Sequence, residues 1–186
     1  MDKLTDYIQI TNGLPSDLCH NIIKEIDKKP WGKHEWYNVK EDYKNKNPQT
    51  SYDKELDVQH GDIETTQKLR PHVNKALKKY YNMFPDYGIF SRFSDIRFNK
   101  YQPGALMLPH IDHIHSLFDG KIKGIPVLSI VGCLNDDFEG ADFILCGKKL
   151  DLKKGDILLF PSNFMYPHQV TEPTKGMRYS FVAWAF

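Results

Sequence analysis

The second half of this chain is a succession of short β-type segments, and this pattern limits the possible folds more than any other feature. From residue 95 onward, strand-length runs alternate with turn sequences rich in Gly, Pro, Asn and Asp. The runs are DIRFNKY, ALMLPHID, VLSIVGCL, ADFILC, DILLF, MYPHQV and MRYSFVAWAF. No helical pattern separates them, so this half predicts an antiparallel sandwich or barrel.

The first half of the chain has the spacing of helices. The segment LPSDLCHNIIKEI puts its Leu and Ile residues on one face, and residues 63–84 repeat that pattern. Pro71 in the second segment marks either the start of a helix or a kink. The polar residues 38–62 between the two segments predict a long surface excursion.

These patterns together predict an α+β chain that is mainly β. Its 186 residues suit one domain with a sizeable core. We expect a single domain over residues 1–186, in which residues 1–90 provide helical support and surface loops. Residues 91–186 then form a sandwich or jelly-roll core that carries the functional site.

The charge and the cysteines narrow the class of protein. A net charge of +1 lacks the basic excess of a dedicated nucleic-acid binder. The three cysteines, Cys19, Cys133 and Cys146, include no CxxC pair, so we interpret them as reduced thiols. The N-terminus, MDKLTDYIQI, has no apolar core of signal-peptide length, and no apolar run approaches the length of a membrane span. We therefore expect a soluble cytoplasmic protein with no nucleic-acid or membrane partner, and the sequence leaves its oligomeric state open.

The stretch LPHIDHIHSL holds three of the eight histidines and raises the question of a metal site. Side chains alternate across a strand, so His110 and Asp112 point one way, whereas His113 and His115 point the other way. Pro109 disfavours a helical pairing of His110 with His113. The strand geometry therefore offers an H-x-D pair, which needs a third ligand from elsewhere in the chain.

His168, in the short strand MYPHQV, is the remaining candidate for that third ligand. Two histidines and one carboxylate on one side of a ferrous ion form the facial triad of non-haem iron oxygenases and leave positions open for other ligands. The alternative is that these residues are ordinary core or surface side chains. We interpret His34, His60 and His72 as ordinary surface histidines.

Arg178 suggests what else the site binds. The run MYPHQV-TEPTKG-MRYSFVAWAF predicts a hairpin that places Arg178 opposite His168, at the start of a strand that is apolar on both faces. A buried guanidinium needs an anionic partner, and a bound dicarboxylate with one end on the metal would supply it. Ser180 shares the face of Arg178 and could add a hydroxyl donor. The alternative is a salt bridge to an acidic residue, with candidates Asp142, Asp156 and Glu172.

Residues 101–186 resemble the iron(II)- and 2-oxoglutarate-dependent dioxygenases, in particular their prolyl 4-hydroxylase-like branch. The ordered pieces that carry the resemblance are Tyr101 with Pro103-Gly104, His110-x-Asp112, Leu134-Asn135 before an acidic turn ending in Gly140, Lys154-Gly155-Asp156 with Leu158-Leu159-Phe160, His168, and Gly176-x-Arg178 with Trp184. The pieces are individually weak, but their order is specific.

The resemblance implies a double-stranded β-helix, or jelly roll, with helical support from the N-terminal half. It implies Fe(II) held by His110, Asp112 and His168, with 2-oxoglutarate and O2 as cosubstrates. It also implies that Arg178 binds the distal carboxylate of 2-oxoglutarate. On this basis the catalytic group consists of those four residues.

Two further residues are implied as ligands of the cosubstrate. Tyr101 resembles the family tyrosine that hydrogen-bonds 2-oxoglutarate, and the alternative is a plain strand aromatic. Some relatives place a tyrosine where this chain has Cys133. We expect Ser180 to act as the second donor instead, because an Arg-x-Ser pairing occurs elsewhere in the superfamily.

The resemblance implies hydroxylation of an unactivated carbon with release of succinate and CO2, most simply on a prolyl residue of a peptide or protein. One alternative is a hydroxylase of a free amino acid or another small molecule. Another is a non-catalytic jelly-roll binding module stabilised by its metal, against which the anion-binding Arg178 argues. A zinc hydrolase would need a general base beside a ligand, and none is evident. Residues 38–62 and 113–127 are either walls of the substrate site or solvated loops.

Overall fold

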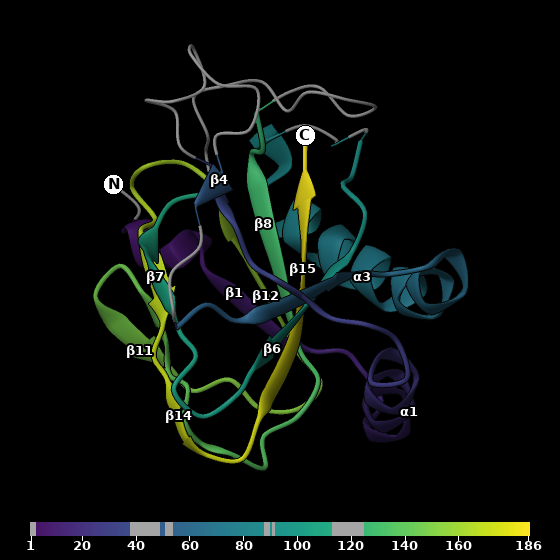
Figure 1. The fold of residues 1–186 in the computed structure, drawn as a ribbon. Coiled ribbons are helices and arrows are strands. Elements are labelled where there is room, and N and C mark those ends of the chain that lie inside the picture. The colour runs from purple at the N-terminus through teal and green to yellow at the C-terminus, as the bar shows by residue number, and fades with distance from the viewer. Residues whose placement is uncertain (1–2, 38–48, 51–53, 88–89, 91, 113–124) are drawn as a thin grey trace.

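The computed structural model describes residues 3–37, 49–50, 54–87, 90, 92–112 and 125–186. It has two packed β-sheets, with two helices on the outer face of the larger one (Figure 1). Within these residues, no helix is both long and apolar enough to cross a membrane.

The larger sheet has seven antiparallel strands. Their order is β1 (Gln9–Asn12), β12 (Asp156–Pro161), β8 (Leu128–Cys133), β15 (Arg178–Ala185), β6 (Arg97–Tyr101), β5 (Asp57–His60) and β2 (Gly32–Lys33). The central strands are apolar on successive residues because both faces of this sheet are covered. Gly132 in β8 is required by packing, since a Cβ there would lie 2.0 Å from the ring of Phe181 in β15.

The smaller sheet has four strands that face the larger sheet. Their order is β11 (Lys148–Leu150), β10 (Phe143–Leu145), β13 (His168–Val170) and β7 (Met107–His110). Two further pairs complete the described strands: β14 (Pro173–Lys175) with β9 (Glu139–Gly140), and β3 (Trp36–Tyr37) with β4 (Gln49–Thr50).

The helices α1 (Ser16–Ile26) and α3 (Ile63–Met83) cover the outer face of the larger sheet (Figure 1). Asp62 caps α3, because its carboxylate accepts the backbone N–H of Thr65 at 2.8 Å. Pro71 lies inside α3 and does not start it. Two short 3-10 helices, Leu4–Tyr7 and Pro85–Tyr87, complete the helical elements that are described.

Alternation along the central strands divides the interior into two cores. Strand residues of one parity, such as Ile130, Leu159 and Phe181, face the helices and pack with helix residues such as Ile22, Leu69 and Tyr80. Strand residues of the other parity, such as Tyr101, Val131, Leu158 and Phe160, face the smaller sheet and pack with its residues Met107 and Phe143. The candidate site lies in this second core, so it is surrounded by apolar side chains.

The predicted mainly-β fold with helical support is confirmed, but two local predictions are wrong. Residues 57–60, expected in the surface excursion, form β5 of the larger sheet. The predicted hairpin does not form, because β13 and β15 lie in different sheets and β14 between them pairs with β9. His168 is therefore paired with His110, and Arg178 is paired with Tyr101.

Candidate metal centre and anion pocket

Three side chains converge between the sheets. His110 ends β7, Asp112 follows it, and His168 begins β13 directly opposite His110. Their ligand atoms all lie within 4.8 Å of one another. The carboxylate oxygens of Asp112 lie 3.6 Å from Nε2 of His110 and 3.7 Å from Nε2 of His168. Two imidazoles and one carboxylate in this arrangement are a donor set that can hold a divalent transition metal.

Backbone carbonyls orient both imidazoles. Nδ1 of His110 lies 2.8 Å from the carbonyl oxygen of Leu108, and Nδ1 of His168 lies 3.2 Å from that of Tyr166. A carbonyl oxygen only accepts, so each Nδ1 carries the proton and each Nε2 presents its lone pair to the centre. The hydroxyl of Ser129 donates to Asp112 at 2.5 Å and fixes the carboxylate in the same way. Such outer hydrogen bonds are typical of metal sites.

The protonation states suit metal binding. Burial, with the neighbouring His168, lowers the pKa of His110 to about 4, so its imidazole is neutral at pH 7. Burial raises the pKa of Asp112, but His168, His110 and the Ser129 hydroxyl outweigh it, and the net pKa lies below its ordinary value. A neutral imidazole and an ionised carboxylate are the forms that coordinate metals.

Aromatic rings enclose the three residues. Phe143 stacks on His168 with ring centroids 5.6 Å apart, and Phe160 meets the same imidazole edge-on at 5.0 Å. The indole of Trp36 meets His110 edge-on at 5.3 Å. These rings keep bulk water from the centre and strengthen the electrostatic interactions inside it.

Arg178 is a buried cation without a carboxylate partner among the residues that the structure describes. It is only 2% exposed. Its guanidinium lies over the rings of Tyr101 and Phe143, with Cζ at 5.3 Å and 5.9 Å from their centroids, and Nη2 lies 3.8 Å from Sγ of Cys133. Cation–π contacts offset only part of the cost of burying a charge.

The salt bridges considered as alternatives for Arg178 do not form. Asp142 pairs with Lys149 at 2.7 Å, and Glu172 pairs with Lys54 at 3.4 Å. Asp156 accepts the side-chain amide of Asn12 at 3.0 Å. None of these three carboxylates therefore neutralises the guanidinium of Arg178.

Ser180 provides a second free donor beside this cation. Its Oγ is buried and has no hydrogen-bond partner within the described part of the chain. Ser180 shares the face of Arg178 on β15 and is paired with Cys133 of β8. A buried hydroxyl is rarely left without a partner. An orphaned hydroxyl next to an unpaired guanidinium fits a carboxylate that both groups bind.

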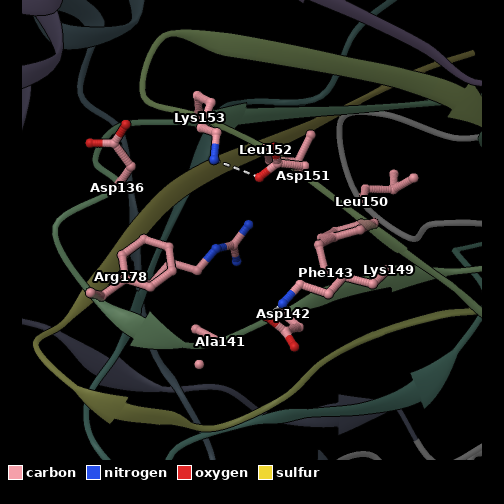
Figure 2. A pocket seen from close by; sticks show the side chains of 12 residues that line it. Asp136, Ala141, Asp142, Phe143, Lys149, Leu150, Asp151, Leu152, Lys153 and Arg178 are labelled. Carbon is pink, nitrogen blue, oxygen red and sulfur yellow. Dashed lines mark ion pairs between the residues drawn. The ribbon is translucent and has the colours of Figure 1, made fainter.

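A cavity of about 210 Å³ opens onto the guanidinium, which points into it (Figure 2). Two ion pairs line this cavity, Lys149–Asp142 at 2.7 Å and Lys153–Asp151 at 2.6 Å. Phe143 lines this cavity and also the one around the His–Asp–His group. Its ring thus lies between the His–Asp–His group and the guanidinium of Arg178.

Sequence reasoning missed a buried network behind His110. His34, predicted at the surface, is only 6% exposed, and its Nδ1 lies 3.0 Å from Oε2 of Glu55. The indole N–H of Trp36 donates to the other oxygen of Glu55, and its ring contacts His110. Burial lowers the pKa of His34 to about 3, so it is a neutral donor to Glu55 at pH 7. No local pattern marks this network, because Glu55 lies in a polar stretch before β5 and reaches it through a bridge with Leu106.

Several residues named as candidates lie outside the described part of the chain. His113, His115 and most of the 113–127 loop belong to this group, as do residues 38–48 and 51–53 of the polar excursion. Trp36, just before this excursion, reaches the site.

The fold matches solved prolyl hydroxylases. The viral collagen prolyl hydroxylase of Paramecium bursaria Chlorella virus-1, solved with 2OG, has 16% identity and a TM-score of 0.70, over 96% of this chain and 95% of that chain. The prolyl-4-hydroxylase of Pseudomonas putida has 18% identity and a TM-score of 0.68, over 96% and 92% of the chains. The Trichoplax adhaerens prolyl hydroxylase, solved with a hypoxia inducible factor oxygen degradation domain peptide fragment, has 19% identity and a TM-score of 0.73, over 98% and 84%. These likenesses confirm the predicted jelly-roll fold.

The family assignment comes from the sequence itself. The family model of the 2OG-Fe(II) oxygenase superfamily matches residues 96–186, which include the His–Asp–His group, Arg178 and Ser180. No curated protein has a matching sequence. The superfamily uses Fe(II), 2-oxoglutarate and O2, and the donor set and the unpaired cation described above fit the first two. Residues 96–186 match the 2OG-Fe(II) oxygenase superfamily, and the chain is a 2-oxoglutarate-dependent dioxygenase.

Proposed function

We propose that this dioxygenase hydroxylates a prolyl residue of a peptide or protein at an unactivated carbon. The fold it shares with prolyl hydroxylases, one of them solved with a peptide fragment, supports this substrate class. The observation that carries the oxygenase chemistry is the buried, unpaired Arg178, whose ring neighbour Phe143 also stacks on His168. A metal site that served structure alone would not need an anion-binding group there.

In this proposal, His110, Asp112 and His168 hold Fe(II) on one side and leave its other positions open. Bound Fe(II) and 2-oxoglutarate supply the oxidising chemistry with O2, so that one oxygen atom ends in succinate and the other on the hydroxylated carbon. The chain fixes the ligands through the Leu108 and Tyr166 carbonyls.

The cosubstrate is positioned by a separate set of groups. We assign its distal carboxylate to the guanidinium of Arg178, with Ser180 as a second donor. Tyr101 is buried at 2% exposure beneath the guanidinium, where its ring fixes the arginine and its hydroxyl is a further donor. Phe143 excludes water between the metal residues and this carboxylate. Because α1 and α3 pack on the sheet that carries Arg178, we treat residues 1–186 as one catalytic domain.

The test is a product assay with matched substrates. The purified enzyme with Fe(II), 2-oxoglutarate and O2 is incubated with proline-containing peptides, with the same peptides carrying alanine in place of proline, and with free L-proline. We expect a mass gain of one oxygen and an equal yield of succinate only with the proline peptides, and none with the His110→Ala variant. Succinate coupled to free L-proline and to no peptide would replace this proposal with the small-molecule alternative.

A further inference from the structure

A second arginine, Arg97, lies near the His–Asp–His group in the interior between the sheets. Alternation along β6 places Arg97, Asn99 and Tyr101 on the face that lines the cavity containing His110 and Asp112. Arg97 and Trp184 keep some exposed surface as whole residues, but burial of the guanidinium of Arg97 lowers its pKa, so the charge itself lies inside. The guanidinium lies over the indole of Trp184, with Cζ 5.3 Å from the ring centroid.

This guanidinium has unused donors. Nε of Arg97 donates to Oδ1 of Asn99 at 3.1 Å, and within the described residues no carboxylate forms an ion pair with it. An arginine carries five N–H donors in a rigid fork that matches a carboxylate. Asn99 and Trp184 hold the guanidinium in place, and its remaining N–H groups have no hydrogen-bond partner among the residues that the structure describes.

Arg97 and Arg178 serve different positions. Arg97 begins β6 and is paired with Val182 of β15, whereas Arg178 of β15 is paired with Tyr101 at the other end of β6. Strand geometry separates these ends by about 13 Å. The two carboxyl carbons of a five-carbon dicarboxylate are only about 5 Å apart when extended. Arg178 and Arg97 also line different cavities. A cosubstrate held by Arg178 therefore leaves Arg97 unpaired.

We propose that Arg97 is a specificity-determining residue that binds a carboxylate of the primary substrate beside the metal residues. This rests on the proposed hydroxylase function and narrows it to an anionic substrate. The carboxylate is either the α-carboxylate of a C-terminal residue or the side chain of an acidic residue next to the reacting one. The guanidinium fork binds it through two parallel N–H···O bonds.

The test measures binding without turnover. The enzyme is loaded with Fe(II) and 2-oxoglutarate in the absence of O2 and titrated by calorimetry with matched probes. N-acetyl-L-proline against its amide tests an α-carboxylate, and a blocked Asp-Pro-Gly peptide against Asn-Pro-Gly tests an acidic side chain. N-acetyl-L-alanine separates recognition of the carboxylate from recognition of proline.

The variants are Arg97→Met, Arg97→Lys and, as a matched control on the exposed face of α3, Arg70→Met. We expect wild type to bind one carboxylate probe roughly ten- to a hundred-fold more tightly than its neutral partner. Arg97→Met should abolish that preference, Arg97→Lys should keep part of it, and Arg70→Met should leave it unchanged. The affinities for Fe(II) and 2-oxoglutarate should stay the same in all four proteins.

Three outcomes would overturn the proposal. They are the absence of a carboxylate preference in wild type, a preference that survives in Arg97→Met, and a loss of Fe(II) affinity in Arg97→Met, which would make Arg97 a support for Asp112 alone. Equal binding of the alanine and proline acids would support Arg97 and remove the prolyl assignment. Failure to bind 2-oxoglutarate in wild type would instead refute the proposed function.

Discussion

Replacing Arg178 with methionine should increase the stability of the apoprotein and inactivate the enzyme. The side chain is 2% exposed and has no carboxylate partner in the described structure. Burying such a charge costs several kcal/mol, and its ring contacts offset about 1 kcal/mol each. Methionine has a similar length and no charge. We therefore expect the free energy of unfolding of the apoprotein to rise by about 1–3 kcal/mol, with an increase in Tm of roughly 2–10 °C.

The same substitution should weaken 2-oxoglutarate binding. Losing one partner of a buried, hydrogen-bonded charge pair costs about 2–5 kcal/mol, which corresponds to a loss of affinity of roughly thirty-fold or more. Urea denaturation of the metal-free protein followed by circular dichroism measures the first effect, and calorimetric titration of the iron-loaded protein with 2-oxoglutarate under anaerobic conditions measures the second. Arg70→Met, at an exposed site, is the control and should change neither quantity.

Two results would refute this reasoning about Arg178. An apoprotein destabilised by Arg178→Met would mean that the guanidinium has a stabilising partner in the free enzyme. An unchanged affinity for 2-oxoglutarate would mean that the distal carboxylate is bound elsewhere.

Three further predictions follow from single contacts. Ser180→Ala removes a buried hydroxyl that has no partner in the described structure, so the apoprotein should be at least as stable as wild type. The affinity for 2-oxoglutarate, measured by calorimetry, should fall roughly five- to tenfold. A loss of stability would show that the hydroxyl is already hydrogen-bonded. Trp36→Phe leaves Glu55 without its indole donor and loosens the packing on His110. The affinity for Fe(II), measured in competition with a chelator, should therefore fall about tenfold. An unchanged affinity would show that Trp36 does not support the metal ligand His110. Burial lowers the pKa of His34 from 6.5 to about 3, so between these pH values the imidazole is protonated in the unfolded state and neutral in the folded state. Stability should therefore fall by up to about 1.4 kcal/mol per pH unit for this group as the pH drops below 6.5, and His34→Gln should flatten that slope in urea denaturation.

The mainly-β fold was predictable because hydrophobic period and turn chemistry are local signals. Alternation along a strand also placed His110 and Asp112 on one face, and the structure brings both to His168. The partner strand of His168 was not predictable in this way. A turn sequence such as EPTKG permits a simple hairpin, but β14 pairs with β9 and carries the chain from one sheet to the other.

The absence of a carboxylate partner for Arg178 was predicted correctly, although the hairpin geometry used in the prediction was wrong. The inference needed only that a charge stood at the start of a buried strand, which the sequence does show. The network of His34, Trp36 and Glu55 had no such signal. Its members lie in polar stretches, and burial by tertiary contacts with β7 and the larger sheet determines their state.

Anaerobic titration of the apoprotein with Fe(II) and then 2-oxoglutarate tests the central claim most directly, because the visible metal-to-ligand charge-transfer band reports both ligands at once. We predict a band that requires iron and cosubstrate together, that is lost in His110→Ala, and that is weakened in Arg178→Ala. A folded, iron-loaded protein that shows no band on addition of 2-oxoglutarate would contradict the assignment of the site.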